Sequence, residues 1–311
     1  MKFDNFSKSI AVFVCTFLCT AKVSAQNEQD ALMMTKNKLC VAADFGYNSW
    51  SDYWEGTFKR NNDNIGRLST KSYMLMFNYG LTDKINLIAG LPYVTTDANK
   101  GTLAGLKGFQ DISFYVKWKP IKKAFGRQNL SLFAVGGYSA PSNNYNIDFM
   151  PMTVGMGSNV LSGRLIADVQ RSKAFATLSA AYMHRSNVEI DRRAYYTTRQ
   201  INSNEVKMPD AGNFQASAGY RSRILIAYAF LDNMTTFGGF DIRKNDMPFV
   251  SNEMNSTKVG ALAKFYLPKH TAFGIHANVW RVLAGRNVGQ ATGFMAGLDY
   301  AFNLNRKSAK N

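Results

Sequence analysis

The side chains best suited to chemistry in this 311-residue chain are a histidine and a serine two positions apart, His184 and Ser186. Residues two apart on an extended strand point to the same face. A histidine beside a serine hydroxyl can remove its proton and make the serine a nucleophile. No glycine follows Asn187, and no acid or amide that would orient the histidine can be identified from the sequence. A polar strand end is therefore the favoured interpretation, and a hydrolase is the alternative.

Metal and phosphate chemistry have weaker support in the sequence. The three histidines are His184, His270 and His276, and their spacings fit no zinc or haem motif. The run Gly155-Met156-Gly157 lacks the Gly-Lys-Ser continuation of a phosphate-binding loop. We therefore expect no metal and no cofactor.

The first 25 residues have the pattern of a secretory signal peptide. Lys2 and Lys8 precede an uncharged apolar run over residues 10–21, and Val23-Ser24-Ala25 supplies a small-x-small cleavage site. The apolar run is too short to span a bilayer as a helix. We expect cleavage after Ala25, so that residues 1–25 are a leader and residues 26–311 form one exported domain.

Cysteine use and hydrophobicity limit what the exported part can be. Cys15 and Cys19 lie in the leader, which leaves Cys40 alone, so no intramolecular disulfide is expected. No stretch of eighteen apolar residues follows the leader, and transmembrane helices are therefore not expected. Only helices and closed barrels can cross a bilayer with every backbone group paired. An exported, aromatic-rich chain of this kind is then either soluble or a barrel.

Strict alternation of apolar and polar residues decides in favour of the barrel. The clearest strand, over 111–119, places Ile112, Phe114, Val116 and Trp118 on one face and charged or polar side chains on the other. An apolar face outside and a polar face inside is what lipid and water require of a membrane barrel. Twelve such strands are predicted, at 39–48, 72–79, 85–94, 111–119, 129–138, 160–170, 175–187, 212–222, 224–236, 256–267, 272–281 and 291–302.

Long and short connections alternate between these strands. Tight turns are predicted near 81–84, 120–128, 171–174, 221–224 and 268–271, and long loops near 49–68, 95–108, 139–159, 188–211, 237–255 and 282–290. An even strand count with both termini on the short-turn side is the outer-membrane arrangement. The fold class is therefore an all-β, antiparallel, up-and-down transmembrane barrel in the bacterial outer membrane. Between 175 and 182 both strand faces are small or apolar, so the inner face there is expected to pack against a loop folded inward.

The chain has a formal net charge of +16, which in a soluble protein would suggest nucleic acid. The export signal argues against that partner. Because side chains alternate between the two faces of a strand, many of the charges are expected to point into the lumen. The predicted lumen set is Lys117, Lys119, Arg164, Arg221, Lys258, Lys264, Asp111, Asp168 and His276. Charged rings in a narrow pore set ion preference, so we hypothesise a polar passage that favours anions. Alternatively, the cations pair with Asp111 and Asp168 and plug a narrow barrel.

Several short motifs are similar to a known barrel family. The segments Gly90-Leu91-Pro92-Tyr93-Val94, 105–112 and Val116-Lys117-Trp118 resemble the outer-membrane family labelled "MetA-pathway of phenol degradation". The stretch from Ser139-Ala140-Pro141 to Ser158 is similar to that family's Pro-Gly loop and glycine-rich strand start, although Ser142 replaces the glycine. The resemblance implies a transporter-type barrel without catalytic residues. Separately, 184–187 is similar to the His-x-Ser-Asn stretch of outer-membrane phospholipases and lipid A deacylases.

The sequence therefore predicts a passive channel or transporter for small hydrophobic or anionic, aromatic-acid-like solutes, and not an enzyme. The alternatives are a non-conducting structural or loop-presenting barrel, and a lipid hydrolase that uses His184 and Ser186. Whether the lumen is open or is occupied by the loop over 139–159 stays undecided at this point. Expected partners are outer-membrane lipid and lipopolysaccharide, the solute, and the barrel-assembly machinery during biogenesis. Loop cations that either bind lipid A phosphates or are simply solvated are Lys59, Arg60, Arg192, Arg193, Arg243 and Lys244.

Overall fold

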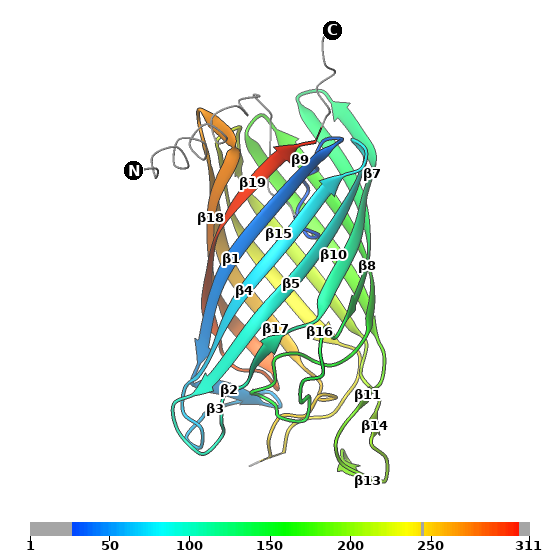
Figure 1. Ribbon diagram of the computed structural model, residues 1–311, viewed down its shortest axis with the longest axis vertical. Coiled ribbons are helices and arrows are strands. Elements are labelled where there is room, and N and C mark those ends of the chain that lie inside the picture. Colours follow the sequence, from blue (N-terminus) through cyan, green and yellow to red (C-terminus); the bar gives the residue numbers. More distant parts are fainter. Residues whose placement is uncertain (1–26, 244–245, 305–311) are drawn as a thin grey trace, which may run out of the picture.

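The chain forms a closed antiparallel barrel of twelve strands (Figure 1). The computed structural model describes residues 27–243 and 246–304. The predicted leader, residues 1–25, lies outside the described residues. No helix in the described part of the chain is long and apolar enough to cross a membrane.

Each barrel strand pairs antiparallel with the next, and the first pairs with the last to close the sheet. Phe45 of the first strand, for example, lies opposite Ala296 on one side and Tyr73 on the other. All twelve predicted strands are confirmed. The barrel strands are β1 (Lys38–Trp50), β4 (Leu68–Gly80), β5 (Ile85–Ala98), β7 (Ile112–Phe125), β8 (Gln128–Ala140), β9 (Val160–Arg171), β10 (Ala174–Arg185), β15 (Ala211–Arg221), β16 (Leu225–Thr236), β17 (Asn255–Leu267), β18 (His270–Arg286) and β19 (Thr292–Asn303).

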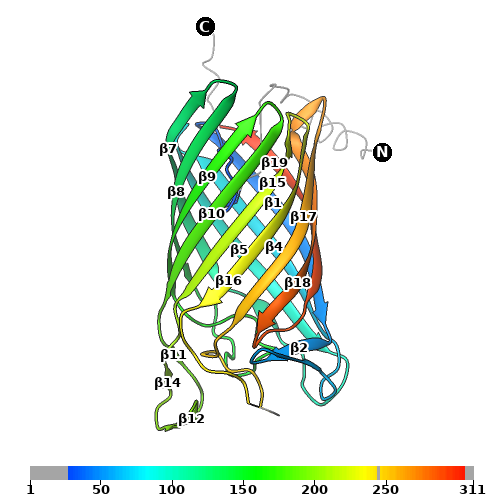
Figure 2. The same ribbon diagram turned by 180° about the vertical axis from the view of Figure 1, so that it is seen from behind.

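The two ends of the barrel differ (Figures 1 and 2). One end carries short turns together with the start of β1 and the end of β19, where Lys38 lies opposite Asn303. The other end carries the long loops. These loops hold the short strands β2 (Asp52–Glu55), β3 (Phe58–Asn61), β6 (Lys107–Phe109), β11 (Val188–Glu189), β12 (Tyr195–Tyr196), β13 (Gln200–Ile201) and β14 (Glu205–Val206). In membrane barrels the short turns face the periplasm and the long loops face outward.

The barrel is apolar outside and polar inside, which is the reverse of a water-soluble domain. Outward positions such as Leu165 (70% exposed), Val116 and Trp118 are large, apolar and uncovered. Their neighbours one residue along, such as Lys117, point inward and are buried. Scattered apolar residues are normal on any surface, whereas a continuous apolar belt around a closed barrel requires hydrocarbon around it.

Two predicted connections were wrong. The turn expected over 120–128 is only Gly126 and Arg127, because β7 continues past Pro120 to Phe125. The pairing of β7 with β8 shifts between Trp118 and Ile121. A bulge of this kind accommodates a proline, which has no amide hydrogen for the ladder. The long loop expected over 282–290 was also too long, since β18 extends to Arg286.

The loop over 141–159 crosses the outer mouth of the barrel. Its Met152 packs with Ile65 and Leu68, which belong to the β3–β4 side of the barrel. Its Ile147 packs with Val188 and Val250, which belong to the loops after β10 and β16. Because these partners lie on different sides of the mouth in the strand order, the loop spans the opening.

At the start of the inner face of β10, where the sequence predicts packing against an inward-folded loop, Phe175 contacts side chains of neighbouring strands. Phe175 is buried, and the Arg221 guanidinium lies 3.9 Å from its ring centroid. The Tyr228 ring packs edge-on against Phe175 at 5.8 Å. Phe175 is therefore covered by side chains of β15 and β16, and with Thr177 it lines a cavity shared with Asp30 and Leu32.

Candidate functional site

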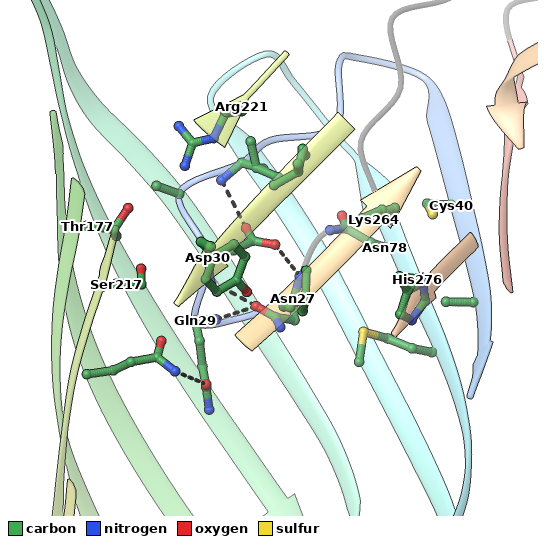
Figure 3. Close-up of a pocket in the computed structure, with 18 of the residues that line it drawn as sticks. Asn27, Gln29, Asp30, Cys40, Asn78, Thr177, Ser217, Arg221, Lys264 and His276 are labelled. Carbon is green, nitrogen blue, oxygen red and sulfur yellow. Dashed lines mark hydrogen bonds between the residues drawn. The ribbon is translucent and has the colours of Figure 1, made fainter. Parts of the chain in front are cut away.

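The segment before β1 folds back into the barrel and occupies the lumen. We call residues 27–34 the lumen segment. Its side chains lie among inward-pointing residues from several strands, including Asn78 of β4, Ser217 of β15 and Lys264 of β17 (Figure 3). This element is not predicted from the sequence, because a short polar-then-apolar stretch before the first strand has no periodicity to identify it.

Lys117 of β7 holds the lumen segment in place. Its side chain is fully buried, and its Nζ donates to Asn27 O at 2.9 Å, Asp30 O at 2.5 Å and Asp30 Oδ1 at 2.8 Å. An ammonium has three hydrogens to donate, and the lumen segment accepts all three. Lys117 lies opposite Asn86, close to the start of β5, so this contact is in the short-turn half of the barrel.

Local hydrogen bonds give the lumen segment its compact shape. Asn27 Oδ1 accepts from the backbone amides of Gln29 and Asp30, each at 2.9 Å, and Asp30 Oδ1 accepts from the amide of Leu32. Short Asn and Asp side chains favour such turns. Apolar contacts follow along the chain: Ala31 packs with Phe133, and Met34 packs with Cys40 near the rim.

Cavities lie beside the lumen segment, and Gln29 lines two of them. The first has a volume of about 130 Å³ and is lined by residues such as Cys40, Tyr228 and His276. The second has a volume of about 260 Å³ and is lined by Glu28, Tyr115 and Arg164, among others. The interior is therefore partly filled, with hollows lined by both charged and apolar side chains.

Most inward-pointing cations of the predicted set have a carboxylate partner. Arg221 binds Asp168, and Lys258 binds Asp232, at 3.1 and 3.2 Å respectively. Lys264 binds Asp299 at 2.6 Å. The acids Asp44, Asp232 and Asp299 were not in the predicted set, although strand parity would have directed them inward. A continuous ring of unpaired cations is therefore not what these strands form.

His276 lies between two carboxylates on the lumen wall. Its Nε2 is 2.7 Å from Asp44 Oδ1, and its Nδ1 is 3.3 Å from Asp299 Oδ1. Together with Lys264 these residues link β1, β17, β18 and β19. Both ring nitrogens are in use, so His276 is a structural bridge within the wall and not a free acid or base.

The remaining members of the predicted set have different surroundings. Arg164 donates to Ser179 Oγ at 2.6 Å, and neither it nor Lys119 forms an ion pair within the described residues. Asp111 lies just before β7 at the long-loop end and accepts a hydrogen bond from Tyr145 of the loop over 141–159. Burial raises the pKa of Asp111 above its usual range. Asp111 therefore anchors an outer loop.

The candidate hydrolase pair has an orienting acid that the sequence did not reveal. Asp210 Oδ1 lies 3.0 Å from His184 Nδ1, and Asp210 Oδ2 accepts from Tyr182 at 2.5 Å. Ser186, however, is engaged elsewhere: its Oγ accepts from the amide of Asn159 and donates to Asn187 O. No hydrogen bond joins Ser186 to His184 among the described residues. The arrangement lacks the contact that would activate the serine.

The loop cations considered as lipid A ligands lie mostly in ion pairs with carboxylates of the outer loops. The pairs are Lys59 with Asp52, Arg60 with Glu55, Arg192 with Asp148, and Arg243 with Asp246. Lys244 lies outside the described residues. A phosphate would therefore have to compete with these carboxylates. Over residues 27–243 and 246–304, no group of His, Cys, Asp or Glu is arranged to hold a metal ion.

The barrel is similar to solved outer-membrane barrels. The COG4313 outer membrane channel from Pseudomonas putida F1 has a TM-score of 0.70 at 13% identity, covering 90% of this chain and 100% of that chain. The NanC porin has a TM-score of 0.46 at 6% identity, covering 84% and 98%. The KdgM porin in complex with disordered oligogalacturonate has a TM-score of 0.44 at 8% identity, covering 84% and 99%.

The first of these likenesses shows the barrel fold. No protein-family model and no curated protein matches the sequence. The resemblance to the phenol-degradation family is therefore not confirmed beyond a barrel of the outer-membrane type.

Proposed function

We propose that this protein is a passive channel of the bacterial outer membrane that admits small hydrophobic or anionic solutes, including aromatic acids. The observation that carries the proposal is a lipid-facing barrel whose interior keeps hollows of about 130 and 260 Å³ lined by charged side chains. A barrel that served only as a scaffold would gain stability from a fully packed, apolar interior. The similarity of fold to the COG4313 outer membrane channel supports the same function.

The preference for anions is traced to Arg164. Most other inward cations form an ion pair with a carboxylate, whereas Arg164 forms none within the described residues and donates to Ser179 Oγ. The carboxylates of Glu28 and Asp232 line the same cavity and attract the guanidinium from a longer distance. A guanidinium presents a fork of donors that matches a carboxylate. Tyr115 and Met183 line the same cavity and supply apolar surface. This combination suits an acid with an apolar body.

Ion selectivity in planar bilayers tests this function. Under a salt gradient, the reversal potential is expected to show anion over cation permeability, and Arg164→Gln is expected to reduce that preference. Arg127→Gln, in the β7–β8 turn, serves as the control and is expected to leave the preference unchanged. A channel indifferent to charge would contradict the assignment to anions, and absence of any conductance would contradict the channel itself.

A non-conducting barrel is the second candidate, favoured by one observation. The loop over 141–159 crosses the outer mouth while the lumen segment occupies the interior. Liposome swelling with solutes of graded size separates the two candidates, because only a channel accelerates swelling. Swelling that falls steeply with solute size is the result expected here.

The route to the membrane forms part of the proposal. We infer that residues 1–25 are a leader cleaved after Ala25, that residues 26–311 are exported as one domain, and that the barrel-assembly machinery inserts it. Lipopolysaccharide is the proposed lipid contact at the long-loop end. Mass spectrometry of the membrane-inserted protein is expected to give an N-terminus at Gln26. An intact N-terminal Met1 would overturn the cleavage.

A further inference from the structure

We propose that Lys117 is a carboxylate-binding site of the channel, that Asp30 of the protein's own lumen segment occupies it, and that a small carboxylate with an apolar body replaces Asp30 as the segment leaves. The inference rests on the proposed function, since it concerns a solute that enters the lumen. It adds the binding site and the means of release.

The first step is the desolvation of Lys117. Its side chain has no exposed surface, and all three of its hydrogens are donated to the lumen segment. A buried charge that loses its partner is strongly unfavourable. When the lumen segment leaves, the Lys117 ammonium loses three acceptors at once, and a carboxylate that arrives in its place restores a charged partner. A replacement anion therefore favours release of the segment.

The second step is the shape of the present occupant. Beside the Asp30 carboxylate, Ala31 packs against Phe133 and the neighbouring apolar side chains Val135 and Ile166. The Lys117 Nζ also lies 5.6 Å from the centroid of the Phe133 ring. The segment thus offers a carboxylate with apolar surface next to it. A free ligand that reproduces both contacts is a small aromatic or aliphatic carboxylic acid.

The third step is that the chain carries its own reporter of segment release. Cys40 is the free cysteine of the described residues, is 2% exposed and lines the cavity beside the lumen segment. Met34 packs directly on it. When the segment withdraws, Cys40 loses this cover and becomes accessible to thiol reagents in the lumen.

The experiment measures the rate at which N-ethylmaleimide labels Cys40 in the full chain, folded in vesicles, by mass spectrometry of the peptide that carries it. Benzoate is expected to accelerate labelling in a saturable way by about tenfold, the factor that corresponds to roughly 1.4 kcal/mol. Benzamide has the same shape without the charge and is expected to have no effect. Equal acceleration by both compounds, or by neither, would overturn the proposal.

Two variants locate the effect. Asp30→Asn is expected to raise labelling without any ligand by about tenfold, because a neutral amide binds the ammonium less strongly than a carboxylate, and to remove most of the benzoate response. Asp63→Asn is the control: it makes the same acid-to-amide change at an exposed aspartate of the loop between β3 and β4, and it is expected to label like the unmodified protein. Equal rates for Asp30→Asn and Asp63→Asn would contradict the assignment to Lys117.

A third variant guards against a folding defect and separates this inference from the proposed function. Lys117→Met removes the buried charge and is expected to make labelling insensitive to benzoate, with the barrel's heat-resistant migration on gels as the check of folding. Conductance is measured on the same samples. If the unmodified protein conducts but benzoate does not change Cys40 labelling, the proposed function stands and this inference is wrong. If benzoate accelerates labelling but the protein does not conduct, this inference stands and the channel function is wrong.

Discussion

At residue scale, Gly297 leaves space for the buried charges of the lumen wall. It lies opposite both Asp44 of β1 and His276 of β18. A Cβ at this position would stand 1.8 Å from Asp44 Oδ1 and 2.8 Å from His276 Nε2. The carboxylate and imidazole can approach to 2.7 Å only because nothing separates them.

The substitution Gly297→Ala is therefore expected to lower the free energy of unfolding by about 1–3 kcal/mol, through overpacking and loss of the Asp44 to His276 hydrogen bond. Urea titration of the protein in vesicles measures this. Gly163→Ala is the control, since nothing lies within 4 Å of a Cβ at Gly163, and it is expected to change stability by less than about 0.5 kcal/mol. Equal effects of the two substitutions would refute the packing argument.

Buried and exposed ion pairs are expected to contribute differently to the free energy of unfolding. Lys264 and Asp299 have side chains 6% and 0% exposed, whereas Lys59 and Asp52 are 45% and 37% exposed. Removing one member of a buried pair leaves an uncompensated charge, so Lys264→Met is expected to cost about 3–5 kcal/mol. Lys59→Gln is expected to cost at most about 1 kcal/mol. The same urea titration checks both, and a reversed order would contradict the role of desolvation.

At element scale, the loop between β16 and β17 is held to the end of β18 by one of its own carboxylates, Asp241. Asp241 accepts hydrogen bonds from Arg286 and Asn287 at 2.7 to 2.8 Å. These donors hold the pKa of Asp241 below its usual range, with Arg286 contributing most. A lowered folded pKa contributes stability above the unfolded pKa, and that stability is lost as the pH falls through the folded value.

Acidification is thus expected to loosen this loop at a pH below the ordinary carboxyl pKa of about 3.9. Hydrogen exchange over 237–243 and 246–254, corrected for the intrinsic pH dependence of exchange, measures the opening. In Asp241→Asn the loop is expected to exchange faster at neutral pH, and its exchange rate is expected to increase less on acidification. If acidification accelerates exchange in this variant as much as in the unmodified protein, other carboxylates cause the effect.

At the scale of the whole molecule, the outer surface of the barrel determines the solvent in which the fold exists. Leu161 and Leu165 lie on the same outward face of β9, and their exposed fractions are 63% and 70%. Leu161 is the second residue of the strand, at the long-loop end, and Leu165 lies near the middle of the strand. The two positions therefore sample different depths of the same bilayer.

A charge on the lipid face costs more at the bilayer centre than at its edge. Leu165→Arg is expected to lower the free energy of folding into vesicles by about 2–4 kcal/mol, and Leu161→Arg by about 0–1 kcal/mol. Folding into lipid vesicles over a urea series measures both values. Equal costs would show that this face does not traverse a bilayer as described.

The twelve strands and their facing could be predicted from the sequence, because alternation with period two is a local property. Ile112 to Trp118 show which side meets lipid without reference to any other part of the chain. Where a local irregularity interrupted the pattern, the prediction was wrong. The sequence predicts a turn over 120–128, but a shift in register lets β7 continue to Phe125.

The tertiary structure alone decided how the lumen is filled. Lys117 and Asp30 are 87 residues apart, and His276 and Asp44 are 232 residues apart. Strand parity could place each charge inside the barrel but could not name its partner. Closing a sheet brings the inner faces of all its strands into one enclosed space. Which charges meet there, and which segment enters, therefore depends on the closed geometry and not on spacing along the chain.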